Sequence, residues 1–266
     1  MYKIRRKLLS QNFLRNPELV KKLLRKSSIG KSDTVLEIGP GRGIITSELL
    51  RSAGKVIAIE LDNNLYSHLV NGYRSNNKFE IVNANFLEFK LPTFSYKVFA
   101  NIPFSITADI IRRLTSDHNF KEGYLIVQKE AARKFIGMPY DNKNQMMSVL
   151  LKPWFDINVF YEFSRSDFYP RPNVDTVMIR ISRVESPIID VKEKSLYENF
   201  VLYTFNKFRV SCLEYKSFLN LFYNFLKRNN SKETALVNRV AEKIRSYQKR
   251  ISKIYRTRND KNWRRF

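Results

Sequence analysis

The chain has 266 residues, and 48 Lys and Arg against 25 Asp and Glu give it a formal net charge of +23. Hydrophobic residues make up 43% of the sequence, which suffices for a packed core and excludes a chain that is disordered throughout. One cysteine and two histidines exclude a disulfide framework and argue against a metal centre, and the sequence lacks the run of about 18 apolar residues that a membrane span needs. We therefore expect a cytoplasmic protein that binds a polyanion.

Strands and helices alternate after a basic N-terminal arm of fifteen residues. A short helix is predicted at 18–26, strands at 34–38, 55–60, 80–82, 96–100 and 124–127, and helices at 44–51, 63–73, 106–114 and 129–135. This alternation is typical of right-handed βαβ units. The sequence therefore predicts an α/β fold with a mostly parallel sheet and helices on both faces.

The pattern changes after Gly137. Two apolar runs, 154–160 and 174–181, flank a proline-containing loop, and part of the second run alternates apolar and polar residues. Such alternation is typical of an antiparallel strand with one covered face. We therefore expect an antiparallel hairpin at an edge of the sheet.

Ser186-Pro187 marks a predicted domain boundary. Beyond it the sequence has helical periodicity, at 193–205, 216–227 and 232–254. The expected organisation is a catalytic domain of residues 1–186 followed by a smaller, basic, helical domain of residues 187–266.

A glycine-rich turn links the first strand of the alternation to its helix. Its residues are Glu37-Ile38-Gly39-Pro40-Gly41-Arg42-Gly43, and glycines let a backbone approach a ligand closely. The spacing departs from the GxGxxG pattern that serves a pyrophosphate. Glu60 ends the next strand, where a carboxylate can accept hydrogen bonds from ribose hydroxyls. These features favour a nucleoside cofactor without phosphates, such as S-adenosylmethionine, over a purely structural turn.

Asn101-Ile102-Pro103-Phe104 follows the strand at 96–100. Ligands of open α/β sheets lie outside the carboxyl ends of the strands, which places this tetrapeptide beside the glycine turn. The exocyclic amine of adenine is a poor nucleophile because its lone pair is delocalised. An Asn side-chain oxygen and a backbone carbonyl beside proline can accept hydrogen bonds from the two hydrogens of this amine. Phe104 offers a flat face on which the base can stack. The tetrapeptide therefore favours alkylation of an adenine amine, with an Asx turn and a buried Phe as the structural alternative.

Five motifs in one order resemble the rRNA adenine N6-methyltransferases. They cover about residues 8–182 and are Gln11-Asn12-Phe13-Leu14, the glycine turn, Glu60, Asn101-Ile102-Pro103-Phe104 and Phe168-Tyr169-Pro170-Arg171-Pro172-Asn173-Val174. Asn-Ile-Pro-Phe is more similar to the Erm type, which acts on 23S rRNA and confers macrolide resistance. Housekeeping small-subunit dimethyltransferases usually carry Leu-Pro-Tyr there. The resemblance implies a Rossmann-like fold, S-adenosylmethionine as cofactor, mono- or dimethylation of adenine N6 in 23S rRNA, and a monomer.

The resemblance also implies roles for single residues. The implied cofactor contacts are Gln11, Asn12 and Leu14 in a closing segment, Gly39 and Gly41 at the methionine part, Glu60 at the ribose, Leu61 at the adenine face, and Asn85 and Asn101. Asn85 aligns with a family aspartate, and its amide oxygen can accept the same hydrogen bond without charge, so we expect weaker cofactor binding. The implied catalytic group is Asn101, Ile102, Pro103, Phe104 and Phe168, with both Phe rings on the target base and no metal.

Basic residues gather at both ends of the chain. The arm carries Lys3, Arg5, Arg6, Lys7 and Arg15; the tail carries Lys243, Arg245, Lys249, Arg250, Lys253, Arg256, Arg258, Lys261, Arg264 and Arg265, with Tyr247, Tyr255 and Trp263 interleaved. Basic side chains bind phosphates in a salt-dependent way, and aromatic rings can stack on unpaired bases. We expect these segments to bind RNA; a merely solvated face is the alternative.

Three other functions remain open from the sequence. A housekeeping small-subunit rRNA dimethyltransferase is nearest, although Ile102 and Phe104 argue against it. A DNA adenine methyltransferase usually carries an acidic residue or Ser where Asn101 stands. A non-catalytic RNA-binding or transcription factor on the same fold would be expected to have a damaged glycine turn, whereas this one is intact.

Overall fold

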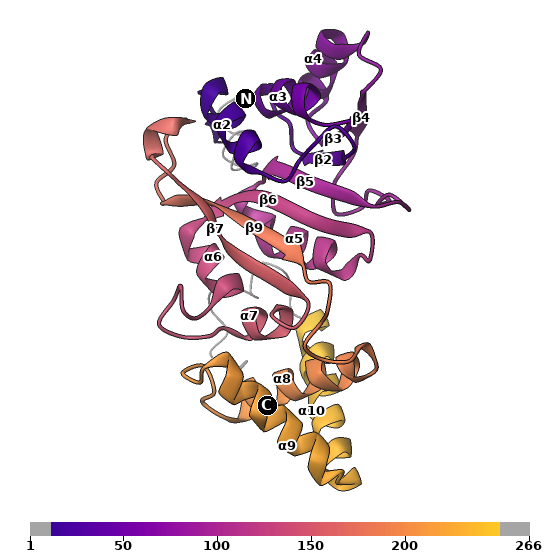
Figure 1. Cartoon of the computed structure of the whole chain (residues 1–266), viewed down its shortest axis with the longest axis vertical. Coiled ribbons are helices and arrows are strands. Elements are labelled where there is room, and N and C mark those ends of the chain that lie inside the picture. Colours follow the sequence, from indigo (N-terminus) through magenta and orange to yellow (C-terminus); the bar gives the residue numbers. More distant parts are fainter. Residues whose placement is uncertain (1–11, 251–266) are drawn as a thin grey trace. The chain divides into compact units, whose positions relative to one another are not determined.

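A computed structural model of the chain describes residues 12–250 (Figure 1). These residues form two compact units. Unit 1 contains residues 12–132 together with Phe155–Arg183, and unit 2 contains Arg133–Trp154 together with residues 184–250. Unit 2 therefore begins its second stretch close to the predicted boundary at 186/187, but it also includes a segment that the sequence had assigned to the catalytic domain.

Unit 1 is built on a seven-stranded sheet in the order β4-β3-β2-β5-β6-β9-β7 (Figure 1). The strands are β2 (Thr34–Ile38), β3 (Lys55–Glu60), β4 (Phe79–Asn83), β5 (Tyr96–Asn101), β6 (Phe120–Gln128), β7 (Phe155–Phe163) and β9 (Thr176–Arg183). The strands from β4 to β6 pair in parallel, whereas β9 is antiparallel to both β6 and β7. The predicted α/β class, with its mostly parallel sheet and antiparallel edge hairpin, is confirmed.

The helices of unit 1 alternate with its strands, and α2 begins at a clear sequence signal. They are α2 (Pro17–Lys26), α3 (Ile44–Ser52), α4 (Asn63–Tyr73), α5 (Thr107–Ser116) and the first part of α6 (Lys129–Ile136). In α2, the Asn16 side chain accepts hydrogen bonds from two backbone N–H groups and Pro17 occupies the first turn, both favoured at a helix start. Leu23 is fully buried, so α2 is anchored by its apolar face.

The central strands carry the core of unit 1. Val35, Val56, Val98 and Leu125 are completely buried, as expected for parallel strands covered on both faces. The strand predicted at 124–127 begins earlier in the structure, at Phe120. The sequence did not predict this first part of β6 because the charged residue Glu122 interrupts the apolar pattern. That carboxylate is buried and pairs with Arg180, which explains how a charge is accommodated inside a covered strand.

Two short strands form a separate antiparallel ribbon that the sequence did not predict. Strand β1 (Phe13–Leu14) pairs with β8 (Phe168–Tyr169), with Phe13 opposite Tyr169 and Leu14 opposite Phe168. The sequence predicts that residues 12–15 belong to the basic N-terminal arm, with no strand there. A two-residue strand has no periodicity to detect, and its partner lies far along the chain, so this pairing is visible only in three dimensions.

Unit 2 is helical. Its helices are the end of α6, α7 (Met146–Leu151), α8 (Lys194–Lys207), α9 (Tyr215–Arg228) and α10 (Ser231–Arg250), and its aromatic core includes Tyr197, Phe200, Phe218, Phe222 and Phe225. The three C-terminal helices were predicted with similar bounds, although residues 251–254 lie outside the described range; α7 was not predicted. Short 3₁₀ turns occur at Phe104–Ile106, Arg165–Asp167 and Val191–Glu193. Within residues 12–250, no helix combines the length and apolar character needed to span a membrane.

Candidate functional site

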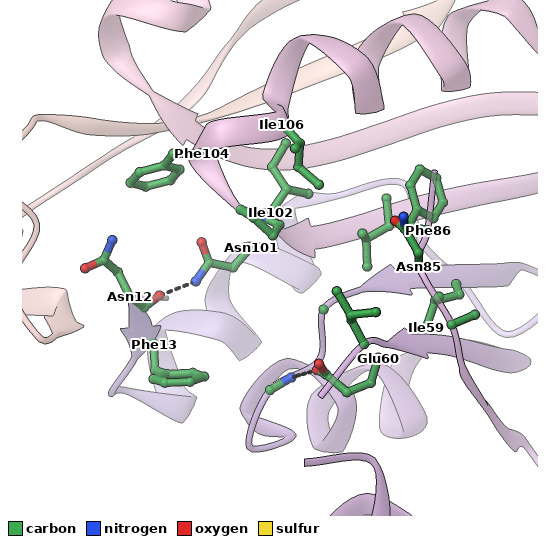
Figure 2. A pocket seen from close by; sticks show the side chains of 16 residues that line it. Asn12, Phe13, Ile59, Glu60, Asn85, Phe86, Asn101, Ile102, Phe104 and Ile106 are labelled. Atoms are coloured by element: carbon green, nitrogen blue, oxygen red, sulfur yellow. Dashed lines mark hydrogen bonds between the residues drawn. The ribbon is translucent and has the colours of Figure 1, made fainter. Parts of the chain in front are cut away.

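A pocket opens at the carboxyl ends of the parallel strands of unit 1 (Figure 2). Its walls are formed by Asn12 and Phe13 of the β1 segment, Ile38, Gly39 and Gly41 at the end of β2, Ile59, Glu60 and Leu61 at the end of β3, Ala84, Asn85 and Phe86 after β4, and Asn101, Ile102, Pro103, Phe104 and Ile106 at the end of β5. This is the edge of an open α/β sheet at which ligands bind. The structure therefore brings together ten of the residues singled out from the sequence.

Glu60 is fixed by the backbone around it. The Gly41 N–H donates to Glu60 Oε2 over 3.0 Å (Figure 2), and the Asp62 N–H donates to Oε1 over 2.9 Å. Burial raises the pKa of Glu60 above its usual value. Each carboxylate oxygen retains a free acceptor direction, so the group can still accept hydrogen bonds from hydroxyls in the pocket.

The glycine turn owes its residue type to close packing as well as to backbone conformation. Gly41 has a φ of 60°, a region that residues with a side chain rarely adopt. A Cβ at this position would lie only 2.7 Å from Phe13 Cε1. The Phe13 ring thus packs directly on the turn, and the Arg42 guanidinium lies 5.8 Å from the centre of that ring. Gly41 is therefore the point at which the β1 segment closes onto the turn.

The Asn101 carboxamide has a defined orientation. Its Nδ2 donates to the Asn12 carbonyl oxygen over 2.5 Å. Because only the nitrogen can donate to a carbonyl, the oxygen must be the other atom, and Figure 2 shows it pointing away from Asn12 on the side of Phe104. Asn101 therefore presents a fixed hydrogen-bond acceptor beside an aromatic ring.

Two predicted contacts lie across the pocket from Asn101, after β3 and β4. Leu61 lines the pocket with 55% of its surface exposed, so its side chain is accessible to a ligand. The Asn85 side chain also lines the pocket, but its Oδ1 accepts from the Leu87 N–H and its Nδ2 donates to Glu88. The amide oxygen can accept a second hydrogen bond, as the predicted contact with an adenine amine requires.

Three predicted residues are not brought to this pocket. Gln11 lies outside the described residues. Leu14 and Phe168 are opposite each other in the β1–β8 ribbon, and both are buried in the core of unit 1. Phe168 is 0% exposed and packs edge-on against Phe163, so in this structure its ring does not face a base, contrary to expectation.

Several pocket residues were missed from the sequence. They are Phe13, Ile38, Ile59, Ala84, Phe86 and Ile106. All are apolar, and each lies within two residues of a predicted site residue, so closeness to a strand end was the available signal. Together they give the pocket an apolar lining between its few polar groups, as is common for small-molecule sites.

The charge of the pocket restricts its ligand. Among the described lining residues, Glu60 alone carries a charge, and none is basic. A pyrophosphate would be left without a cationic partner here, even though the whole chain has a net charge of +23. A nucleoside with a cationic sulfonium and no phosphates fits this lining, which agrees with the cofactor expected from the glycine spacing.

Comparison with known proteins decides the family. The profile of the family described as "Ribosomal RNA adenine dimethylase" matches residues 2–260. The chain belongs to the ribosomal RNA adenine dimethylase family. It is therefore an S-adenosylmethionine-dependent rRNA adenine N6-methyltransferase, as the five motifs implied.

Individual relatives of this dimethylase family carry two kinds of name. An "rRNA adenine N-6-methyltransferase" of Limosilactobacillus reuteri is 33% identical over 82% of this chain and 86% of its own. A "Ribosomal RNA small subunit methyltransferase A" of Clostridium botulinum (strain Kyoto / Type A2) is 34% identical over 75% of each chain. Two crystal structures, the 23S rRNA methyltransferase ErmE and a dimethyladenosine transferase from Plasmodium falciparum, each align with a TM-score of 0.66. Their identities are 28% and 29%; ErmE covers 71% of this chain and 77% of its own, the other 73% and 71%.

Glu37 of β2, at the start of the glycine turn, is an unusual buried acid. Its Oε2 accepts from Thr46 Oγ1 over 2.6 Å, whereas Oε1 has no hydrogen-bond partner among the described residues. Burial is the main cause that raises its pKa to about 8, from 4.5 in an unfolded chain. Between these two pH values the folded protein therefore retains a proton that the unfolded chain has released.

We expect this proton to make the protein less stable as pH rises from about 4.5 to 8. Unfolding releases the proton in this window, so Glu37 alone lowers the free energy of unfolding by up to about 1.4 kcal/mol per pH unit. Urea unfolding of the wild type and Glu37→Gln at several pH values measures this, and the variant should have the flatter dependence. Glu80→Gln, at an exposed ion pair with Lys55, is the control. Equal slopes for wild type and Glu37→Gln would contradict the assignment.

Proposed function

We propose that this methyltransferase modifies N6 of an adenine in 23S rRNA, as a cytoplasmic monomer, and that the modification confers resistance to macrolide-type antibiotics. The Asn101 oxygen, held beside Phe104 by the bond to Asn12, carries the proposal for adenine N6. The Asn-Ile-Pro-Phe form of the motif, which resembles the Erm type, favours 23S rRNA.

The pocket residues divide the work between donor and acceptor. When bound, S-adenosylmethionine would supply a methyl group on a sulfonium sulfur, which would leave as a neutral thioether. Gly39 and Gly41 would let its methionine part approach the backbone, and Glu60 would accept hydrogen bonds from its ribose. Leu61 would cover one face of its adenine ring, Asn85 would accept from the adenine amine, and Asn12 would close the site.

The target adenine would enter from the side of Phe104. Asn101 Oδ1 and the Ile102 carbonyl, whose position Pro103 fixes, would accept hydrogen bonds from the two amine hydrogens and direct the nitrogen lone pair toward the methyl group. The proton that the nitrogen loses on methylation would leave to solvent. Phe104 would stack on the base, which has to leave its own stack to reach the pocket. Rate enhancement in this arrangement comes from positioning and from preorganised acceptors.

Unit 2 would supply sequence-independent affinity for RNA. Lys232, Arg239 and Lys243 of α10 are exposed. The part of the predicted basic tail beyond Arg250 lies outside the described residues, as do Lys3, Arg5, Arg6 and Lys7 of the predicted arm. Phosphate contacts of this kind weaken steeply with salt.

Small-subunit rRNA is the second candidate substrate. The relatives named "Ribosomal RNA small subunit methyltransferase A" are as similar to this chain as the one named "rRNA adenine N-6-methyltransferase". Family membership alone therefore favours neither subunit, and only the Asn-Ile-Pro-Phe motif favours 23S rRNA.

Methyl transfer to purified rRNA distinguishes the two substrates. Naked 23S and 16S rRNA are each incubated with the protein and labelled S-adenosylmethionine, and the modified nucleotide is mapped. Its mass, measured by mass spectrometry, distinguishes one added methyl group from two. We expect N6-methylated adenine in 23S rRNA and, on expression in a macrolide-sensitive bacterium, a raised inhibitory concentration. Label that appears only in 16S rRNA would overturn the proposal in favour of the second candidate.

A further inference from the structure

The β1–β8 ribbon has two different faces. Leu14 and Phe168 are opposite each other and buried. Phe13 and Tyr169 are the other opposed pair, and residues directly opposite in an antiparallel pair point to the same side. Because side chains alternate along a strand, Phe13 and Tyr169 share the face that is turned away from the core. Phe13 lines the pocket, so Tyr169 lies next to the pocket wall.

Each aromatic ring of this outer face lies close to a guanidinium. The Arg42 guanidinium lies 5.8 Å from the centre of the Phe13 ring, and the Arg15 guanidinium lies 5.9 Å from the centre of the Tyr169 ring. Both arginines are exposed, and Tyr169 is exposed over 59% of its surface. An exposed ring of this size, with a guanidinium held close to it, has the chemistry of a nucleotide site, because the ring can stack on a base and the guanidinium can bind a phosphate.

The ribbon is held firmly at both strands. The Arg15 N–H donates to the Asp167 carbonyl over 3.0 Å, and Asn101 Nδ2 donates to the Asn12 carbonyl. On the core side, the Phe168 ring packs on Phe163 at 5.3 Å between ring centres. These contacts place Tyr169 in a fixed register with Asn101, so a base on Tyr169 would have a defined distance from the methylation site.

We propose that Tyr169 stacks on an unpaired base next to the target adenine and that Arg15 binds the phosphate beside it. The inference rests on the proposed function, because it requires an RNA adenine in the pocket. It assigns to the outer face of the ribbon the recognition of the nucleotide that flanks the target. Phe104 then stacks on the target adenine itself, and Tyr169 sets the position of the RNA strand that carries this adenine.

Two variants of Tyr169 test the stacking. Tyr169→Ala removes the ring, whereas Tyr169→Phe keeps it. The first should weaken the binding of a labelled single-stranded oligoadenylate about 5- to 100-fold, as expected for the loss of one stacked base. It should raise the KM for naked rRNA by a similar factor, with kcat and the Kd for S-adenosylmethionine close to those of the wild type. Tyr169→Phe should behave as the wild type does.

Phe94→Ala is the matched control. Phe94 is also exposed, over 48% of its surface, but it precedes β5 and so lies at the opposite end of the strand from Asn101. For Arg15, the salt dependence of oligoadenylate binding is the readout: Arg15→Gln should reduce the slope of log K against log salt by about 1. Arg74→Gln, an exposed arginine at the end of α4, should leave it unchanged.

The outcomes separate this inference from the proposed function. The stacking role would be overturned, while methylation by the wild type stands, if Tyr169→Ala left oligoadenylate binding and KM unchanged. It would also be overturned if Phe94→Ala weakened binding and raised KM as much as Tyr169→Ala does. Retained binding of S-adenosylmethionine shows that each variant is folded. If the wild type methylates no rRNA, the proposed function fails, and the oligoadenylate measurement still decides whether Tyr169 binds a base.

Discussion

Asn101→Ala should lower kcat for rRNA methylation by roughly 100- to 1,000-fold, the usual effect of removing one preorganised hydrogen-bonding group from the reacting centre. The variant loses the oxygen that the bond from Nδ2 to the Asn12 carbonyl directs toward the side of Phe104. Single-turnover methyl transfer to naked rRNA measures the effect. The Kd for RNA should stay within a few-fold of the wild type, because Asn101 supplies little of the phosphate contact.

Asn119→Ala is the control for a general effect on the fold. Asn119 also uses its Nδ2 to donate to a backbone carbonyl, that of Pro92 at 3.1 Å. It lies just before β6, at the amino ends of the parallel strands and so away from the pocket at their carboxyl ends. It should methylate at the wild-type rate. An Asn101→Ala protein that binds cofactor and RNA and keeps full kcat would remove Asn101 from the chemistry.

Glu60→Gln should weaken the binding of S-adenosylmethionine about 10- to 100-fold, because hydrogen bonds to a charged acceptor contribute about 1.5–3 kcal/mol. The variant also replaces one carboxylate oxygen by an NH₂ group, which would face the N–H of Gly41 or of Asp62. Both changes act on cofactor binding in the pocket. Isothermal titration calorimetry with the cofactor measures their combined effect on the Kd.

The same carboxylate gives a pH signature. Burial raises the pKa of Glu60, so acidification should protonate it at a higher pH than an ordinary glutamate. Cofactor affinity of the wild type should therefore fall as pH is lowered through that pKa, whereas Glu60→Gln should lack this fall. Glu80→Gln on the neighbouring strand, at its exposed ion pair, should match the wild type at every pH; an unchanged affinity in Glu60→Gln would place the ribose elsewhere.

The sheet and the location of the pocket could be predicted from the sequence because both depend on local patterns. Short apolar runs such as 34–38 and 55–60 identify strands that are buried on both faces. Parallel strands bring their carboxyl ends to one edge, so Gly41, Glu60 and Asn101 had to meet once the strands were identified.

The role expected for Phe168 could not be corrected from the sequence. Its orientation depends on the register of the β1–β8 pairing, and a shift of one residue exchanges the two faces of a strand. The observed register turns Phe168 into the core and Tyr169 outward. A motif aligned to a family identifies the segment, but only the strand pairing decides which of two adjacent aromatic rings is turned away from the core.

The membership of residues 133–154 was equally hidden, for a different reason. This segment begins within helix α6 of the alternating pattern. The sequence pattern changes after Gly137, but nothing in it indicates that these residues pack with the C-terminal helices. Its place in unit 2 comes from contacts with α8: the Tyr197 hydroxyl donates to the Val149 carbonyl over 2.8 Å, and the Trp154 and Tyr197 rings lie 5.6 Å apart. Such long-range packing has no local signature.

Unit 2 is assembled from two separated stretches of the chain, so a single crossover in a gene cannot exchange it between relatives without also exchanging β7 and β9 of unit 1. A recombinant joined near Arg183 would inherit Val149 and Trp154 from one parent and Tyr197 from the other. Such a chimera would carry a mismatched aromatic core unless the residues on both sides had changed together. Transplanting the helical module, whether by evolution or in the laboratory, therefore requires both stretches to move as a pair.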